Sequence, residues 1–186
     1  MTEPMFPEPA GASEDTGADP PSAGSSRLGF VIRTDGAARG NPGPASLGAV
    51  LIDASRPDAA DPRAPADASI SDYLGVQTNN VAEYTGVVRA LALARELGAR
   101  EVAMLLDSKL IVEQLAGRWR VKDAKLIPLW EAARATLRTF DRWSAVHVPR
   151  AQNSAADALA NEAIDRVNAG GPVSVVRRPT WPAARD

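Results

Sequence analysis

The order of patterned segments in this chain predicts an α/β fold, a mixed five-stranded sheet flanked by helices. β-type runs and helical patterns follow one another as βββ-α-β-α-α-β-α, with no internal repeat. Of 186 residues, 45% are hydrophobic and 24% are charged, which is enough for a real core. No apolar run approaches the ~20 residues that span a bilayer, so no membrane partner is expected.

The first three β-type runs are Leu28–Thr34, Ser46–Ile52 and Ser69–Val76. The turn-prone pair Asp35-Gly36 is expected to end the first of them. Residues 53–68 are rich in Asp, Ala and Pro and are too many for a simple hairpin. We interpret them as an acidic insertion at the tip of two antiparallel strands, a mobile surface loop dispensable for chemistry.

The remaining segments alternate between helix and strand. Apolar residues at helical spacing predict helices, and short apolar runs predict strands. The helices are expected at residues 80–97, 108–116, 124–140 and 154–167, and the strands at 101–106 and 145–149.

Both ends of the chain differ from the middle in composition. Residues 1–27 combine Pro, Gly and Ser with five acids and one base, which is typical of disorder. Residues 168–186 contain Gly170-Gly171 and three prolines, and we expect a C-terminal tail. The folded domain is therefore expected at 28–167. The N-terminus has no basic-then-apolar signal pattern, which indicates a cytoplasmic protein.

Two rare residue types limit the possible chemistry. The chain has no cysteine and one histidine, His147. Disulfides, a cysteine nucleophile and a multi-histidine zinc site are therefore excluded. Any metal would have to bind carboxylates.

Four acids are predicted at the ends of elements: Asp35 and Asp107 after strands, Glu83 and Asp157 in first helical turns. Singly, each has a structural explanation as a cap or turn residue. Together, strand ends and helix starts would bring all four to one edge of the sheet. Such a cluster is repulsive unless hard cations such as Mg²⁺ or Mn²⁺ bind within it. Two such ions can hydrolyse a phosphodiester.

The acids lie within four ordered motifs: TDGAARGNPG from Thr34, TNNVAEY from Thr78, LDSK from Leu106, and VPRAQNSAADALA from Val148. Together they resemble type 1 ribonuclease H, in the compact bacterial and archaeal form without a basic protrusion. The resemblance covers about residues 28–167 and implies a ribonuclease H-like fold. It implies an endonuclease that cuts the RNA strand of RNA–DNA hybrids and leaves 3′-hydroxyl and 5′-phosphate ends.

The resemblance also implies a role for each acid. Asp35 would bridge two Mg²⁺ or Mn²⁺ ions, Glu83 and Asp107 would hold the ion near the leaving group, and Asp157 the ion that activates water. Glu83 would also contact the region of the RNA 2′-hydroxyl. Many members have a loop histidine before the last helix, which this chain lacks, and His147 is expected to be structural.

Two further groups are candidates for substrate contacts. Neutral residues flank the acids and suit hydrogen bonds to sugar and phosphate, although turn and cap roles stay open for them. A second stretch has four bases around a tryptophan, which suits the DNA backbone, or else forms a solvated loop whose tryptophan anchors in the core. The candidates are Gly36, Asn41, Thr78, Asn79 and Asn80, then Arg118, Trp119, Lys122 and Lys125. Trp130 and Trp143 are expected in the core.

Three other functions stay open at this point. The chain could bind hybrid or double-stranded RNA without cutting it, it could be a nuclease that also cuts double-stranded RNA, or it could be a scaffold that uses its acidic segments and no metal. All four acids are present, which favours the nuclease. We expect it to act as a monomer.

Overall fold

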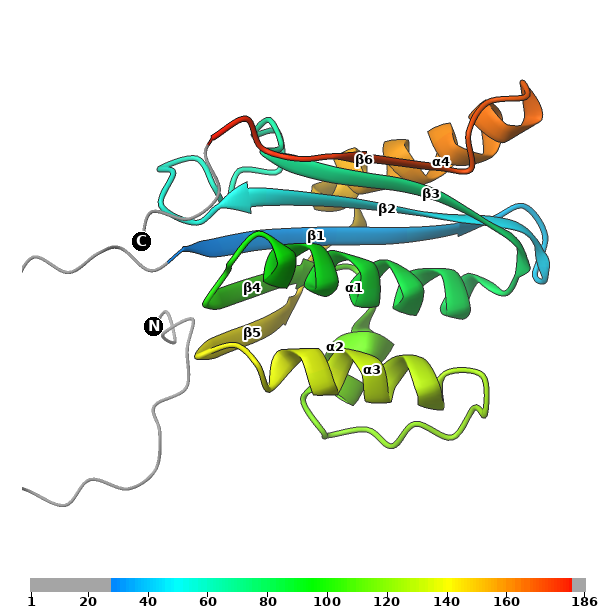
Figure 1. Ribbon diagram of the computed structural model, residues 1–186. Helices are drawn as coiled ribbons and strands as arrows, with labels where there is room; N and C mark the ends of the chain where they lie inside the picture. Colours follow the sequence, from blue (N-terminus) through cyan, green and yellow to red (C-terminus); the bar gives the residue numbers. More distant parts are fainter. Residues whose placement is uncertain (1–27, 182–186) are drawn as a thin grey trace, which may run out of the picture.

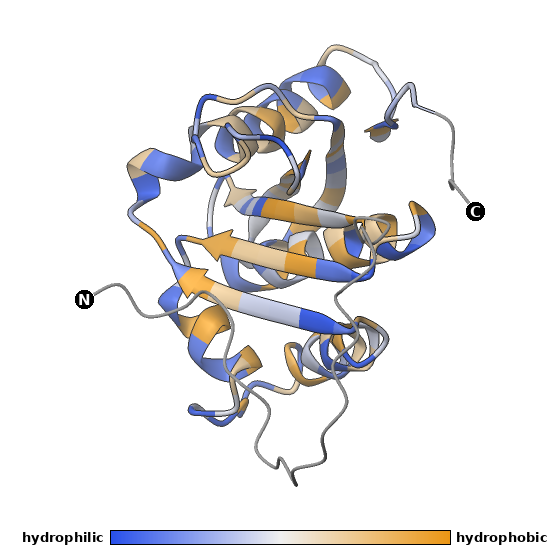
Figure 2. Cartoon of the chain, turned by 90° about the vertical axis from the view of Figure 1, so that its left-hand side faces the viewer, coloured by the Kyte–Doolittle hydropathy of each residue, from blue (hydrophilic) through white to orange (hydrophobic). Residues whose placement is uncertain are grey.

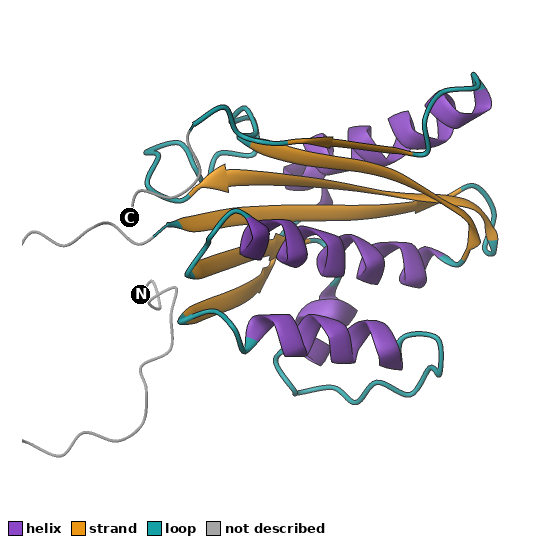
Figure 3. Ribbon diagram, in the orientation of Figure 1, coloured by secondary structure: helices purple, strands orange, loops and turns teal. Residues whose placement is uncertain are grey.

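The computed structural model describes residues 28–181, which form a mixed sheet with helices on both faces (Figures 1 and 3). The strand order is β5-β4-β1-β2-β3-β6. β4 runs parallel to β1 and β5, and the other neighbours are antiparallel. The strands are β1 (Gly29–Ala38), β2 (Gly43–Asp53), β3 (Ala68–Gln77), β4 (Glu101–Leu106), β5 (Arg142–His147) and β6 (Ser174–Arg177).

Four α-helices and one 3₁₀ turn connect the strands: α1 (Asn79–Glu96), α2 (Lys109–Leu115), α3 (Ile127–Leu137), the turn η1 (Arg150–Asn153) and α4 (Ser154–Asn168). The predicted α/β class and the order of the first nine elements are confirmed. α3 begins three residues later than predicted, with a proline in its first turn, where the missing N–H has no cost. The fifth strand begins three residues and ends two residues earlier than predicted, because it pairs with β4 from Arg142 onward.

The prediction of five strands is wrong, because part of the expected C-terminal tail forms β6. β6 pairs antiparallel with β3, with Ser69 opposite Arg177. Arg166 of α4 holds the returning chain, since its guanidinium donates to the carbonyls of Ser71 and Pro172. β6 thereby covers the backbone groups of an otherwise open edge strand. A four-residue run after two glycines is too weak a local signal to predict this pairing.

The first strand is longer than predicted. Asp35 and Gly36 do not form a turn; they lie inside β1, opposite Gly48 and Leu47 of β2. The chain turns instead at residues 39–42. Pairing along a nine-residue register outweighs the local turn preference of Asp-Gly.

The main core lies between the sheet and α1, α2 and α3, and α4 covers the opposite face (Figures 1 and 3). Phe30, Ile32, Leu47, Tyr84 and Leu91 are fully buried in this core. The helices carry both hydrophobic and hydrophilic residues, as expected for helices with one face on a sheet (Figure 2). Trp130 and Trp143 pack against the core, as predicted. Between residues 28 and 181, no helix has the length and apolar character needed to cross a membrane.

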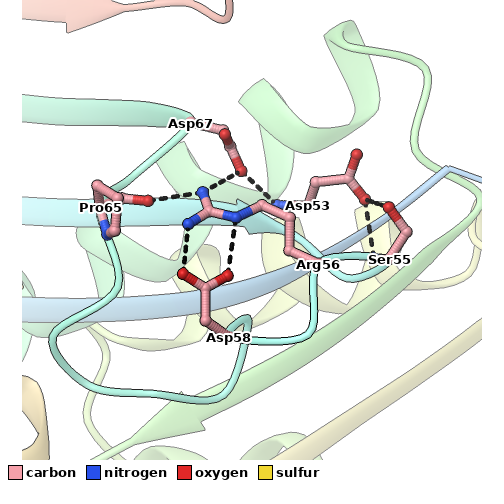
Figure 4. Close-up of polar contacts among 6 residues, drawn as sticks. All are labelled: Asp53, Ser55, Arg56, Asp58, Pro65 and Asp67. Carbon is pink, nitrogen blue, oxygen red and sulfur yellow. Dashed lines mark hydrogen bonds and ion pairs between the residues drawn. The ribbon is translucent and has the colours of Figure 1, made fainter.

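The acidic insertion is folded, which contradicts the expectation of a mobile loop. We call residues 54–67, between β2 and β3, the insertion loop. Arg56 organises it by donating to the carboxylates of Asp58 and Asp67 and to the carbonyl of Pro65 (Figure 4). Ala59 is buried against β1 and β2. The acids that suggested a solvated segment are bound by a cation of the same loop, which composition alone does not reveal.

Candidate active site

Asp35 is the most deeply buried of the four candidate acids. It lies in β1 with a relative exposure of 4%, and its Oδ2 is buried without a hydrogen-bond partner among the described residues. Asp107 directly follows β4, the parallel neighbour of β1. The Asn153 amide joins the two strands by donating to the Thr34 carbonyl at 2.7 Å and to Asp107 Oδ1 at 3.1 Å.

Glu83 reaches the site because α1 lies unusually close to β1. A Cβ on Gly36 would stand 2.3 Å from the Glu83 backbone nitrogen, so only glycine permits this approach. The Asn79 amide donates to Glu83 Oε1 at 3.2 Å and orients the carboxylate. Gly36 is itself buried, so its part in the site is to admit the helix.

Asp157 depends on an equally close approach between α4 and β2. A Cβ on Gly48 would stand 2.0 Å from the Ala156 carbonyl oxygen. The Ser46 and Ser71 hydroxyls donate to the carbonyls of Ala160 and Leu159, which fastens the helix to the sheet. Because Gly48 pairs with Asp35, this contact sets the position of Asp157 relative to Asp35.

The proposed capping roles of the acids do not occur. Thr78 caps α1 by accepting from the Val81 N–H, and Ser108 caps α2 by accepting from the Ile111 N–H. Asn153 is the N-cap residue of α4, so Ser154 does not form a capping box with Asp157. Asp157 lies in the first turn of α4, where the helix dipole favours an anion. The acids are thus not needed to complete the helix ends.

The four acids interact electrostatically. Burial is the largest cause of a rise in the pKa of Asp35, and together with the nearby carboxylates of Asp107, Asp157 and Glu83 it raises this pKa to about 8. Burial also raises the pKa of Glu83, with Asp107 as the next cause. The cluster therefore holds negative charge that the surrounding residues do not fully compensate.

This charge predicts how stability depends on pH when metal is removed. The folded pKa of Asp35, about 8, lies above its ordinary value of 3.8, so folded protein binds more protons between these pH values. In EDTA, the free energy of unfolding should fall as pH rises from 4 to 8. The Asp35→Asn variant should be the more stable protein at pH 8, by about 1–3 kcal/mol, and should lose most of this pH dependence. Thermal unfolding of wild type and Asp35→Asn at pH 5 and pH 8 measures how the stability of each protein changes with pH. An equal change in the two proteins would contradict the prediction.

The residues present fit hard divalent cations. Every candidate ligand is a carboxylate oxygen, and the buried Asp35 Oδ2 has no other partner among the described residues. Between residues 28 and 181, however, no three Asp, Glu or His side chains form a ready-made metal site. Ion binding would therefore have to draw the carboxylates together.

Two basic residues lie beside the acids. Arg150 of η1 is exposed; its Nη2 lies 3.8 Å from Asp157 Oδ1, and its charge opposes the rise in the pKa of Glu83. Arg150 is not among the site residues predicted from the sequence, although it lies seven residues before Asp157. His147 ends β5 with an exposed side chain, and its Nε2 lies 3.2 Å from the Asp107 carbonyl oxygen.

The neutral candidates gather where the 39–42 turn meets the start of α1. Asn41 Oδ1 accepts from the Asn79 N–H at 3.2 Å, and Thr78 is the helix cap. Asn41 and Asn80 are exposed, so they are free to meet a ligand. Thr78 has a cap role and Asn79 an orienting role, and both residues remain partly exposed to solvent.

The basic stretch after α2 is exposed. Arg118, Trp119, Lys122 and Lys125 all face solvent, and Trp119 is 46% exposed, so it does not anchor in the core. Arg118 forms an ion pair with Glu113. Lys109 Nζ lies 6.0 Å from the centre of the Trp119 ring, which connects this stretch to the start of α2, next to Asp107.

Comparison with known proteins gives consistent matches over the described domain. Residues 33–163 match the family model described as reverse transcriptase-like. The bifunctional protein Rv2228c of Mycobacterium tuberculosis is 47% identical over 135 residues, which are 73% of this chain and 35% of that protein. Ribonuclease HI of Halobacterium salinarum is 44% identical over 131 residues, 70% of this chain and 62% of that protein. The chain thus spans about a third of the first relative and under two thirds of the second.

Two solved ribonuclease H structures match over nearly their whole length. The RNase H1 of Halobacterium salinarum aligns with a TM-score of 0.67 and 42% identity, covering 74% of this chain and 98% of that one. LC11-RNase H1, which was isolated from compost, was crystallised in complex with an RNA/DNA hybrid. It aligns with a TM-score of 0.66 and 37% identity, covering 75% of this chain and 99% of that one.

Proposed function

Because this chain belongs to the ribonuclease H family as a type 1 member, we propose that it hydrolyses the RNA strand of RNA–DNA hybrids. The observation that carries the proposal is the group of four interacting acids around the buried Asp35 Oδ2, which has no hydrogen-bond partner within residues 28–181. A structural role would not require four carboxylates whose charge is only partly compensated. LC11-RNase H1 binds an RNA/DNA hybrid, which supports the same substrate class here.

In this proposal the four carboxylates of Asp35, Glu83, Asp107 and Asp157 hold two Mg²⁺ or Mn²⁺ ions. Bound ions would lower the pKa of the attacking water and stabilise the leaving oxygen, giving 3′-hydroxyl and 5′-phosphate ends. Asn153 keeps Asp107 beside β1, and Asn79 keeps Glu83 directed into the site. The exposed Arg150 attracts the phosphate backbone toward the acids.

The deciding experiment is cleavage of end-labelled RNA–DNA hybrid, double-stranded RNA and DNA duplex in Mg²⁺, Mn²⁺ and EDTA. We expect metal-dependent cutting of the RNA strand of the hybrid. Cutting of double-stranded RNA as well would widen the substrate class. Hybrid binding without cutting in either metal would favour a binding protein, and the absence of both would favour a scaffold.

An alanine substitution at Trp119 tests the proposed contact with the DNA strand. Stacking of an exposed tryptophan on a base or sugar contributes about 1–3 kcal/mol, so Trp119→Ala should raise the KM for hybrid about tenfold and change kcat little. Trp181, which stacks on Phe30 at a ring distance of 6.4 Å, is the matched control. Steady-state kinetics of both alanine variants measure the effect; an unchanged KM for Trp119→Ala would remove this residue from the substrate site.

A further inference from the structure

Arg33 is a buried cation without a hydrogen-bonded carboxylate among the described residues. It lies in β1 with a relative exposure of 1%, two residues before Asp35. Residues i and i+2 of a strand project to the same face, so Arg33 and Asp35 share one side of the sheet, about 6–7 Å apart along the strand. The pairing of Arg33 with Val50, and of Asp35 with Gly48, fixes that arrangement.

The guanidinium of Arg33 joins two segments that are far apart in sequence. Its Nη2 donates to the carbonyl of Ala60, in the insertion loop, at 2.8 Å. Its Nη1 donates to the carbonyl of Gln152, in η1, at 3.0 Å. Arginine remains charged even when buried, and burying it is costly unless its hydrogen bonds are satisfied. The two carbonyls satisfy only part of the guanidinium, because its Nε is buried without a hydrogen-bond partner among the described residues, and the charge of Asp61 in the same loop offsets some of the remaining cost. A site that needed only packing would be filled more cheaply by an apolar side chain.

The second of these contacts lies next to the proposed active site. Gln152 precedes Asn153, whose buried side chain holds both Thr34 and Asp107. Asp157 follows four residues later, in the first turn of α4. A fixed Gln152 carbonyl therefore restrains the backbone from which Asn153 reaches Asp107.

The first contact depends on the folded insertion loop. Arg56 draws Asp58 and Asp67 together (Figure 4). Ala59 packs against Val31 and Ile52. These contacts place the next residue, Ala60, so that its carbonyl meets Arg33. The loop thus lies on the same face of the sheet as Asp35 and forms one wall of the Arg33 site.

We propose that Arg33 is a positioning residue that uses the insertion loop to hold the η1 turn, and through Asn153 the carboxylate of Asp107, in the arrangement for catalysis. The proposal rests on the proposed function for its kinetic effect. The structural effect, which is the restraint of η1 by Arg33, does not depend on the proposed function. It replaces the expectation that the loop is dispensable for chemistry.

Two variants break the same connection from opposite ends. Arg33→Met keeps the length of the side chain and removes its donors. Replacing residues 55–66 with Asn-Gly removes the Ala60 carbonyl and leaves Arg33 in place. Each should lower kcat about 10- to 100-fold, with KM for hybrid within twofold, and raise the Mg²⁺ concentration for half-maximal rate. The combined variant should lose no more of its kcat than either single variant, because both changes remove the same connection between the insertion loop and η1. Arg33→Lys should recover part of the rate.

Arg166→Met is the matched control. Arg166 is also a largely buried arginine that donates to Ser71 and Pro172, but it lies at the far end of α4 from Asp157. Its loss should lower the unfolding midpoint and leave kcat per folded molecule unchanged. If Arg33→Met or the shortened loop retained kcat and Mg²⁺ dependence within twofold, the proposal would be overturned.

Hydrogen–deuterium exchange measures the connection without any cleavage. In metal-free protein, amides of residues 150–157 should exchange faster in Arg33→Met and in the shortened-loop protein than in wild type. Arg166→Met should not change them. Faster exchange with no cleavage by wild type would keep the positioning role and reject the nuclease. Unchanged exchange in the shortened-loop protein would reject the positioning role even if Arg33→Met failed to fold.

Discussion

Replacing Asp35 with asparagine should lower the rate of hybrid cleavage by at least about 1,000-fold, with the fold and hybrid binding intact. Asparagine has the shape of aspartate but carries no charge, so the change removes the ligand and little else. Asp35 is the acid on which the other three act: burial and the charges of Asp107, Asp157 and Glu83 all raise its pKa. Its loss should therefore affect every bound ion.

The measurement is single-turnover cleavage of labelled hybrid in Mg²⁺, with hybrid affinity measured in EDTA. Asp72→Asn is the matched control, because Asp72 is also a buried strand aspartate but pairs with Arg89 at 2.8 Å, outside the site. We expect the control to lose stability and keep its rate per folded molecule. A rate above a tenth of wild type in Asp35→Asn would exclude Asp35 as a metal ligand for this reaction.

The four candidate acids could be predicted because they follow from local patterns. Alternation and helical spacing correctly placed Asp107 after a strand and Asp157 in a first helical turn, whereas Asp35 lies within β1 and Glu83 lies beyond the first turn of α1. All four still come to one place, because strand ends and helix starts meet at one edge of an α/β sheet. The residues that make this meeting possible could not be predicted in the same way. Gly48 and Asn153 act through contacts with α4 and β4, and such contacts depend on the pairing register and on the approach of helix to sheet.

The same distinction explains two of the wrong structural predictions. Residues 174–177 form β6 because β3 offers them an open edge, and the sequence of these four residues does not by itself indicate that pairing. The insertion loop is folded because Arg56 and Arg33 supply partners for its acids and carbonyls. In the sequence, Arg33 is simply one residue of a β-type run. Its two carbonyl partners lie 27 and 119 residues away, so local patterns do not reveal them.

A methyl group at Gly48 should disrupt the site from the opposite side of Asp35. The added Cβ would meet the Ala156 carbonyl oxygen at 2.0 Å and the Ala160 nitrogen at 2.7 Å, both of them backbone atoms that a rotamer change cannot move. α4 would have to shift away from β2. We expect Gly48→Ala to cost about 2–3 kcal/mol of folding free energy, which corresponds to a fall of about 5–10 °C in Tm.

The shift of α4 should also affect activity beyond the loss of stability. Asp157 follows Ala156 directly, so the displaced helix carries its carboxylate away from Asp35, and a displacement of about 1 Å can cost 100-fold in rate. Gly86→Ala is the control, since its Cβ would meet the Thr34 Cβ at 3.5 Å, an ordinary contact, within a helix that favours alanine. Cleavage is measured well below the Tm of each variant. If Gly48→Ala were folded and cut hybrid at the wild-type rate, the close approach of α4 to β2 would serve packing alone, and the position of Asp157 would have to be set by the η1 turn.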